Sequence, residues 1–223
     1  MDDAARSLAA TIDHTLLRPE ATRDDVRRLC EEAVRLGFAA VCVNPCRVAE
    51  ARRWTDRSEV AVATVCGFPL GASRSAVKAA EAARGADEGA TEVDMVIAVG
   101  AVKDGDWAAV VADIAAVVAA AGEAAVKVIL ECGLLDDAEK RTAAVAAVDG
   151  GAAFVKTSTG FLAGGATVED VALLKRAVAG RARVKASGGI RTLGRARAML
   201  AAGADRLGTS SGVAIMEELA GRG

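Results

Sequence analysis

Eight short apolar runs alternate with helix-like segments along the whole 223-residue chain. Strands are predicted over residues 11–17, 39–44, 60–65, 92–97, 125–131, 153–157, 183–186 and 205–208. Apolar residues at helical spacing predict helices over residues 23–36, 46–54, 73–88, 106–121, 136–148, 168–179, 193–202 and 212–219. Side chains that can cap these helices stand at Thr22, Ser73, Asp136, Thr167 and Thr192.

Eight strand-helix units, spaced about 20 to 35 residues apart, fit a (β/α)8 barrel that forms a single domain over residues 1–223. A short N-terminal helix is expected to plug the bottom of this barrel. The alternative is a doubly wound open sheet, which ordinarily uses fewer strands, and no G-x-G-x-x-G turn follows the first strand. In a barrel, functional groups are expected at the C-terminal ends of the strands.

Charge and composition argue against several classes of protein. The 28 basic and 30 acidic residues nearly cancel and form no long basic run, so nucleic acid is not an expected partner. Apolar stretches end well before 18 residues and the first residues lack a signal-peptide pattern, so no membrane contact and a cytoplasmic location are expected. The five scattered cysteines are predicted to be reduced, buried thiols, and with His14 as the only histidine no zinc site is expected.

Two lysines close neighbouring predicted strands and precede turns rich in glycine and hydroxyl side chains. Lys156 is followed by Thr-Ser-Thr-Gly, and Lys185 by Ala-Ser-Gly-Gly. If the strands are adjacent, ammonium groups about 4 Å apart repel by roughly 4 kcal/mol at an effective dielectric of 20, or about 3 pKa units. One lysine is then neutral near pH 7 and can attack a carbonyl carbon. A structural salt bridge is the alternative for each lysine.

Alternation along residues 92–97 places Asp94 on the face opposite Val93 and Met95, which predicts that Asp94 faces the barrel interior. A buried carboxylate needs a cation, and the two lysines supply it. Asp94 is either a proton-transfer group or only their counter-ion. His14 is predicted to be a hydrogen-bonded structural residue. Cys42 ends the second strand and is expected to line the pocket without acting as a nucleophile, since no histidine is near it in sequence.

The segments 187–191 and 208–212 follow the last two strands and lead into helices. Their glycine amides and serine hydroxyls, together with a helix N-terminus, are groups that bind phosphate. Barrels of this type commonly hold phosphate after strands 7 and 8. The two loops therefore predict a phosphate site next to the lysines.

Seven ordered motifs resemble the deoxyribose-phosphate aldolase family. They are IDHTLL at 12–17, VCVNP at 41–45, TVCGFPLG at 64–71, EVDMVI at 92–97, VKTSTG at 155–160, KASGGIR at 185–191 and GTSS at 208–211. The resemblance implies a class I aldolase that interconverts 2-deoxy-D-ribose 5-phosphate with D-glyceraldehyde 3-phosphate and acetaldehyde, in deoxynucleoside catabolism. It implies no metal or organic cofactor, and a homodimer.

The resemblance also implies residue roles: Lys156 forms the Schiff base, and Asp94 and Lys185 relay protons. The residues expected to bind the substrate or its phosphate are Gly160, Gly188, Gly189, Gly208, Ser210 and Ser211, with Thr159 and Cys42. Two alternatives remain at this point. One is a lysine aldolase on the same barrel that uses a ketone donor, and the other is a non-catalytic sugar-phosphate sensor.

Overall fold

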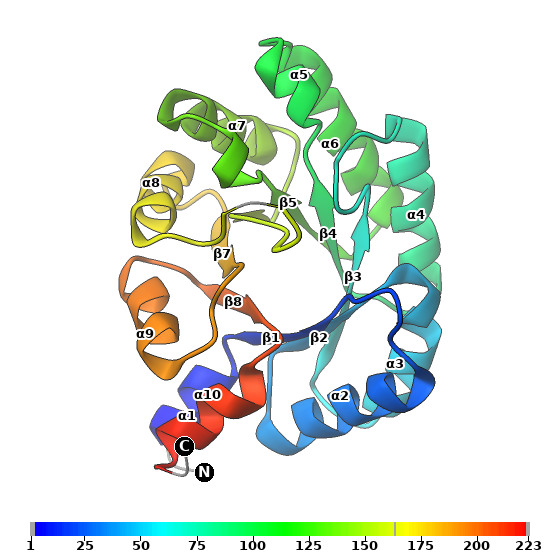
Figure 1. Ribbon diagram of the computed structural model, residues 1–223. Coiled ribbons are helices and arrows are strands. Elements are labelled where there is room, and N and C mark those ends of the chain that lie inside the picture. The colour runs from blue at the N-terminus through cyan, green and yellow to red at the C-terminus, as the bar shows by residue number, and fades with distance from the viewer. Residues whose placement is uncertain (1–2, 163, 222–223) are drawn as a thin grey trace.

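Eight parallel strands close into a barrel in simple chain order, and the helices surround it (Figure 1). The structure is a computed structural model that describes residues 3–162 and 164–221. The strands are β1 Ile12–Leu16, β2 Ala40–Val43, β3 Ala61–Cys66, β4 Glu92–Val96, β5 Ala125–Ile129, β6 Phe154–Lys156, β7 Arg183–Ser187 and β8 Arg206–Thr209. All eight predicted strands are present, and the (β/α)8 barrel is confirmed.

The helices follow the strands with small shifts from the predicted bounds. They are α1 Asp3–Ala9, α2 Arg23–Leu36, α3 Val48–Thr55, α4 Ser75–Asp87, α5 Val99–Lys103, α6 Trp107–Ala121, α7 Asp137–Asp149, α8 Val168–Val178, α9 Leu193–Ala201 and α10 Gly212–Leu219. The 3₁₀ turns η1 Pro45–Arg47 and η2 Cys132–Leu134 complete them. Helix α5 and both 3₁₀ turns were not predicted, because single turns are too short to show a helical period.

Four of the five predicted N-caps are found at the helix starts. Thr22 and Asp136 form reciprocal capping boxes, and the hydroxyls of Thr167 and Thr192 accept a backbone N–H of the first turn. The prediction for Ser73 is wrong. Helix α4 begins two residues later, at Ser75, and no side chain caps it there.

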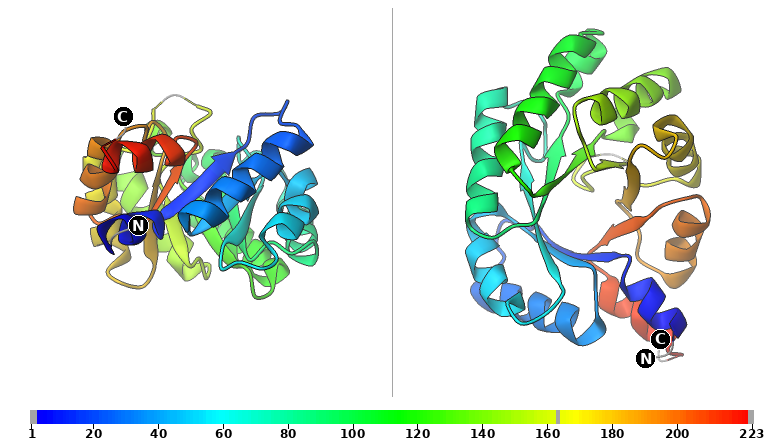
Figure 2. Two further views of the ribbon diagram at one scale, coloured as in Figure 1. Left: turned by 90° about the horizontal axis from the view of Figure 1, so that it is seen from below. Right: turned by 180° about the vertical axis from the view of Figure 1, so that it is seen from behind.

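Helix α1 lies beside α10 at the edge of the ring, with Leu8 and Ala9 in the hydrophobic core. Figure 1 and the opposite view in Figure 2 both place it outside the barrel opening. The expectation that this helix plugs the bottom of the barrel is therefore wrong. The buried residues of α1, Leu8 and Ala9, instead belong to the same hydrophobic core as Ile215 and Met216 of α10.

The barrel interior is charged rather than apolar at its centre. On β4, Val93 and Met95 pack into the core beneath the helices, whereas Glu92 and Asp94 alternate with them and contact other strands from the inside. The strand register pairs Asp94 with Lys127 and Lys156 with Lys185. Residues paired across parallel strands point to the same side, so the sheet itself brings these charges together.

A second buried charge pair joins two of the surrounding helices. Lys78 of α4 is fully buried and donates to Asp113 of α6 at 2.7 Å and to the backbone oxygen of Val96 at 3.0 Å. Removing the ammonium leaves a buried carboxylate without its partner, which is more damaging than losing an exposed pair.

We expect Lys78→Ala to lower the free energy of unfolding by about 3 to 5 kcal/mol, because Asp113 is left buried and unpaired. The measurement is urea unfolding followed by circular dichroism. Arg141→Ala is the matched control, since Arg141 and Asp137 form an exposed pair at 3.7 Å, which contributes little. A Lys78→Ala variant as stable as this control would contradict the prediction.

Candidate active site

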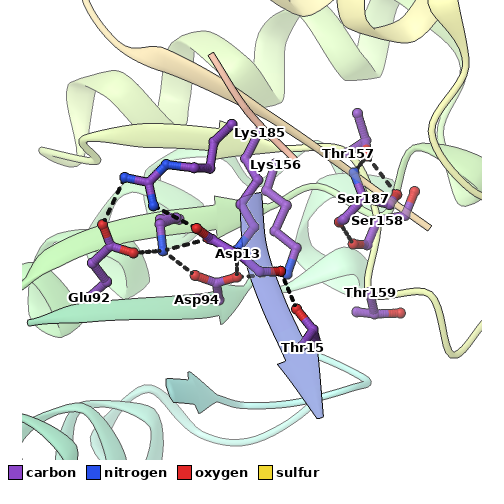
Figure 3. A network of polar contacts seen from close by, with 12 residues as sticks. Asp13, Thr15, Glu92, Asp94, Lys156, Thr157, Ser158, Thr159, Lys185 and Ser187 are labelled. Atoms are coloured by element: carbon purple, nitrogen blue, oxygen red, sulfur yellow. Dashed lines mark hydrogen bonds and ion pairs between the residues drawn. The ribbon is translucent and has the colours of Figure 1, made fainter. Parts of the chain in front are cut away.

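Three side chains from different strands, those of Asp94, Lys156 and Lys185, meet in the barrel interior (Figure 3). One oxygen of the Asp94 carboxylate, Oδ2, accepts a hydrogen bond from Lys156 Nζ at 2.7 Å and another from Lys185 Nζ at 2.7 Å. All three residues are buried. The structure therefore brings together the two lysines and the aspartate that the sequence singled out, with Asp94 facing the interior.

The two lysines differ in their protonation because they differ in their carboxylate partners. Burial lowers the pKa of Lys156, and the repulsion from Lys185 adds to this effect while Asp94 opposes it. The pKa of Lys185 is raised in spite of burial, since it also donates to Asp13 and so faces two carboxylates. Lys185 does depress its neighbour, as expected, but burial is the larger cause.

The carboxylates remain ionised in this cluster. Burial by itself would raise the pKa of Asp94, but Lys127, Lys156 and Lys185 outweigh it and hold the pKa well below its usual range. The pKa of Asp13 is lowered in the same way, with Lys185, Lys127 and Arg206 opposing the effect of burial. Asp94 is thus an acceptor of hydrogen bonds from ammonium groups.

Three charged residues beneath Asp94 escaped the analysis of the sequence. Lys127 donates to Asp94 Oδ1 at 2.9 Å and to Glu92 at 2.6 Å, and Arg206 donates to Asp13 at 2.5 Å and to Glu92 at 3.2 Å. A signal for Lys127 was present. It stands in the apolar run 125–129, in the same kind of context that drew attention to Lys156.

A cavity of about 310 Å³ opens above Lys156. Of the residues predicted to bind substrate, Thr159, Gly160, Gly188, Gly189, Gly208 and Ser210 line it. Further lining residues that the sequence analysis did not assign are Thr15, Leu16, Leu17, Arg18, Phe161, Ser187, Ile190, Arg191 and Thr209. The motifs at 12–17 and 185–191 contain several of these, but no role for them followed from the motifs alone.

Two predicted binding residues lie next to the cavity without lining it. Ser211 precedes α10, and its backbone N–H donates to the Thr209 hydroxyl at 2.9 Å. Cys42 is fully buried in a small apolar cluster with Leu17 and Val65. Burial raises the pKa of the Cys42 thiol to about 11, which keeps the thiol protonated and agrees with the expectation that it is no nucleophile.

The loops after β6 and β7 are held against each other. The Thr157 hydroxyl donates to the Ser187 backbone oxygen and accepts from the Ser187 N–H, both at 3.0 Å. Gly188 has φ +95°, and a Cβ built there would lie 2.9 Å from the Gly165 Cα. Only glycine fits this close approach, which fixes the backbone at the edge of the cavity.

His14 lies outside the barrel interior. Its Nε2 is 2.9 Å from a carboxylate oxygen of Glu32 on α2, and its ring contacts Phe38. The structural, hydrogen-bonded role predicted for this histidine is confirmed.

All five cysteines are free thiols, and the prediction that they are buried is confirmed for four of them and wrong for Cys46, which is exposed. Across residues 3–162 and 164–221, no three His, Cys, Asp or Glu side chains are grouped as ligands for a metal ion. Within the same ranges, no helix is long and apolar enough to cross a membrane.

Comparison with known proteins gives one consistent result. The family model of the DeoC/LacD family aldolases matches residues 7–218. A deoxyribose-phosphate aldolase of Deinococcus radiodurans is 56% identical over 210 residues, covering 94% of this chain and 96% of the relative. One from Halalkalibacterium halodurans is 54% identical over 214 residues, covering 95% and 96%.

Solved structures agree with the sequence relatives. The deoxyribose phosphate aldolase of Aeropyrum pernix, described as a tetramer, superposes with a TM-score of 0.91 at 36% identity, covering 97% of this chain and 93% of that chain. A structure from Coccidioides immitis gives a TM-score of 0.95 at 41% identity, covering 97% and 87%. This chain belongs to the DeoC/LacD aldolase family.

Proposed function

We propose that the chain is a class I deoxyribose-phosphate aldolase, a lyase that reversibly cleaves 2-deoxy-D-ribose 5-phosphate into D-glyceraldehyde 3-phosphate and acetaldehyde. The observation that carries the proposal is Lys156, a buried lysine of lowered pKa that opens into the same cavity as the glycine loops after β7 and β8. The relatives in Deinococcus radiodurans and Halalkalibacterium halodurans, which bear this name and match nearly the whole chain, support it.

In the first stage the neutral amine of Lys156 attacks the aldehyde carbon C1 of the open-chain sugar phosphate. A C–N bond forms, and the carbinolamine loses water to give an iminium, which accepts electrons from the neighbouring C–C bond. We assign to the Lys185 ammonium the proton that goes to the leaving oxygen, and to ionised Asp94, which accepts from both lysines, their orientation.

In the second stage the C2–C3 bond breaks and its electron pair moves toward the nitrogen, leaving a neutral enamine on Lys156. The C3 hydroxyl loses its proton and becomes the aldehyde of glyceraldehyde 3-phosphate. Water held by Asp94 and Lys185 takes up that proton and later supplies one to C2 of the enamine. Hydrolysis of the resulting iminium frees acetaldehyde and restores the amine.

The phosphate of the substrate is assigned to the glycine and serine residues of the cavity wall. Gly160, Gly188, Gly189, Gly208 and Ser210 line the cavity, and we propose that their backbone amides and the Ser210 hydroxyl bind the phosphate. Ser211 stands at the start of the eight-residue helix α10, whose free N–H groups add favourable charge for an anion. Thr159 lines the cavity, and Cys42 is buried in the apolar cluster that includes the cavity-lining Leu17.

The remaining assignments concern the protein as a whole. We propose one catalytic domain over residues 1–223, a reaction without metal or organic cofactor, and a cytoplasmic role in deoxynucleoside breakdown. We propose a homodimer. The Aeropyrum pernix relative is described as a tetramer, so a tetramer is the other assembly to test for. Light scattering of the purified chain measures the assembly.

The central test is borohydride trapping with acetaldehyde, followed by peptide mass mapping. An ethyl adduct on Lys156 is expected, because the imine with acetaldehyde is reduced in place. Lys156→Leu should abolish this adduct and lower turnover at least about a thousandfold. Lys103→Leu, which removes a half-exposed lysine on α5, is the matched control. A parent protein that binds sugar phosphate but gives no adduct would point to a sensor or a ketone-specific aldolase.

Lys185→Leu should shift the acid limb of the pH-rate profile to higher pH and lower the rate near neutral pH. The reason is that the Lys185 ammonium lowers the pKa of Lys156, so its loss raises that pKa and leaves less neutral amine. The measurement is the pH dependence of kcat/KM between pH 5 and about 10. An acid limb at the same pH as in the parent would show that Lys185 does not lower the pKa of Lys156.

Ser210→Ala should raise KM for 2-deoxyribose 5-phosphate by about 10-fold or more, since a hydrogen bond to a charged group is lost. The same variant should leave the kinetics with unphosphorylated 2-deoxyribose unchanged, which makes that sugar the internal control. An equal loss with both sugars would place Ser210 outside the phosphate site.

A further inference from the structure

Glu92 and Arg206 form a charged layer beneath the lysine site that the proposed reaction does not use. Arg206 of β8 donates to Asp13 of β1 at 2.5 Å and to Glu92 of β4 at 3.2 Å. Glu92 also accepts from Lys127 of β5 at 2.6 Å. Neither Glu92 nor Arg206 is among the residues that line the cavity above Lys156. Contact with substrate therefore does not explain their presence.

These groups belong to one continuous cluster, which we call the interior charge cluster. Its cations are Lys127, Lys156, Lys185 and Arg206, and its carboxylates are Asp13, Glu92 and Asp94. Six of the seven are buried, and the Arg206 side chain is 12% exposed. If every group were ionised, the cluster would carry one excess positive charge. A buried charge without compensation is strongly unfavourable, so loss of one proton is favoured.

The contacts decide which cation loses that proton. Among the residues that the structure describes, Lys156 donates to a single carboxylate, Asp94, and shares the accepting oxygen with Lys185. Lys127, Lys185 and Arg206 each donate to two carboxylates. The pKa values follow the same order, because burial lowers that of Lys156 while paired carboxylates raise the other three.

We propose that Glu92 and Arg206 are positioning residues that set the protonation state of Lys156 through the net charge of the interior charge cluster. The inference rests on the proposed function only in taking Lys156 as the nucleophile. On this proposal, the net charge of the whole cluster, and not the Lys156–Lys185 pair alone, determines whether the Lys156 amine is protonated.

The surroundings of Lys156 account for the charges that act on it. Asp94 of β4, Lys185 of β7 and Cys42 of β2 act on it directly. Lys127 of β5, Asp13 of β1 and Arg206 of β8 belong to the same cluster and are connected to Lys156 through those side chains. Arg18 and Arg191 line the cavity, and Glu131 accepts from Thr159. Strand β3 contributes the apolar Ala63 and Val65. Arg206 and Glu92 can be changed without altering the side chains that contact Lys156 directly.

Three variants change the charge count in a controlled way. Arg206→Met leaves three cations and three carboxylates, so the cluster is neutral with Lys156 protonated. Glu92→Gln leaves four cations and two carboxylates, which favours the neutral amine further. The double variant has three cations and two carboxylates and restores the single excess charge of the parent.

The readout is the pH dependence of trace acetylation of Lys156 by acetic anhydride, mapped by peptide mass spectrometry. This reagent reacts with the neutral amine and needs no substrate. We expect Arg206→Met to raise the apparent pKa by about one unit, which cuts labelling on the acid limb about tenfold. Glu92→Gln should lower the apparent pKa of Lys156 by a similar amount, and the double variant should have an apparent pKa close to that of the parent.

Arg206→Lys keeps the charge and is the control for shape, so its labelling profile should match the parent. The proposal fails if both single variants shift the apparent pKa of Lys156 in the same direction, or if the double variant does not restore the parent value. It also fails if Arg206→Lys shifts this pKa as far as Arg206→Met does. If Arg206→Met does not fold, Glu92→Gln decides alone: a downward shift supports the proposal, and an unchanged or upward one overturns it.

The proposed function fails separately from this inference. Absence of a borohydride adduct with acetaldehyde in the parent would overturn the aldolase assignment, whereas the labelling shifts would still stand. Conversely, the parent could give the adduct while the labelling profiles of the variants do not shift with the charge count. That result would support the aldolase assignment and show that Glu92 and Arg206 do not set the protonation state of Lys156.

Discussion

The carboxylate of Asp94 is the contact on which the rest of the site depends. Its Oδ1 accepts from Lys127, and its Oδ2 accepts from both Lys156 and Lys185. Without it, Lys127 would keep Glu92 and Lys185 would keep Asp13, but Lys156 would lose the carboxylate that it bonds among the described residues. With it, two lysines remain charged and the third is left with only a shared partner. A single side chain therefore both permits the cluster and makes its members unequal.

The same charge count bears on the chemistry of the proposed intermediate. The cluster is neutral when Lys156 is a free amine, and it is neutral again when the nitrogen belongs to an enamine. Between these states the iminium adds a positive charge that no further carboxylate offsets. Electron flow from the breaking C–C bond toward the nitrogen removes that charge. The surroundings thus oppose the iminium and favour the step that consumes it.

Much of the fold was readable from the sequence because its signals are local. Strand and helix periods lie within a few residues, and adjacent strands in a barrel follow chain order, so the pairing of Lys156 with Lys185 was predictable. Arg206 and Glu92 were not, since their roles depend on contacts across the barrel between β8, β1 and β4. Asp13 was visible in a motif, but nothing local in the sequence shows that it meets a lysine 172 residues away.

The closure of the barrel has a consequence for how this protein matures. Asp13 on the first strand bonds Lys185 on the seventh and Arg206 on the eighth, across 172 and 193 residues of chain. These contacts exist only after β1 and β8 have paired. A chain that has formed only its first six strands already carries Lys156 but lacks two of the four cations that unbalance the site. The lowered pKa of Lys156 is therefore a property of the closed barrel, because Lys185 and Arg206 join the site from the last two strands.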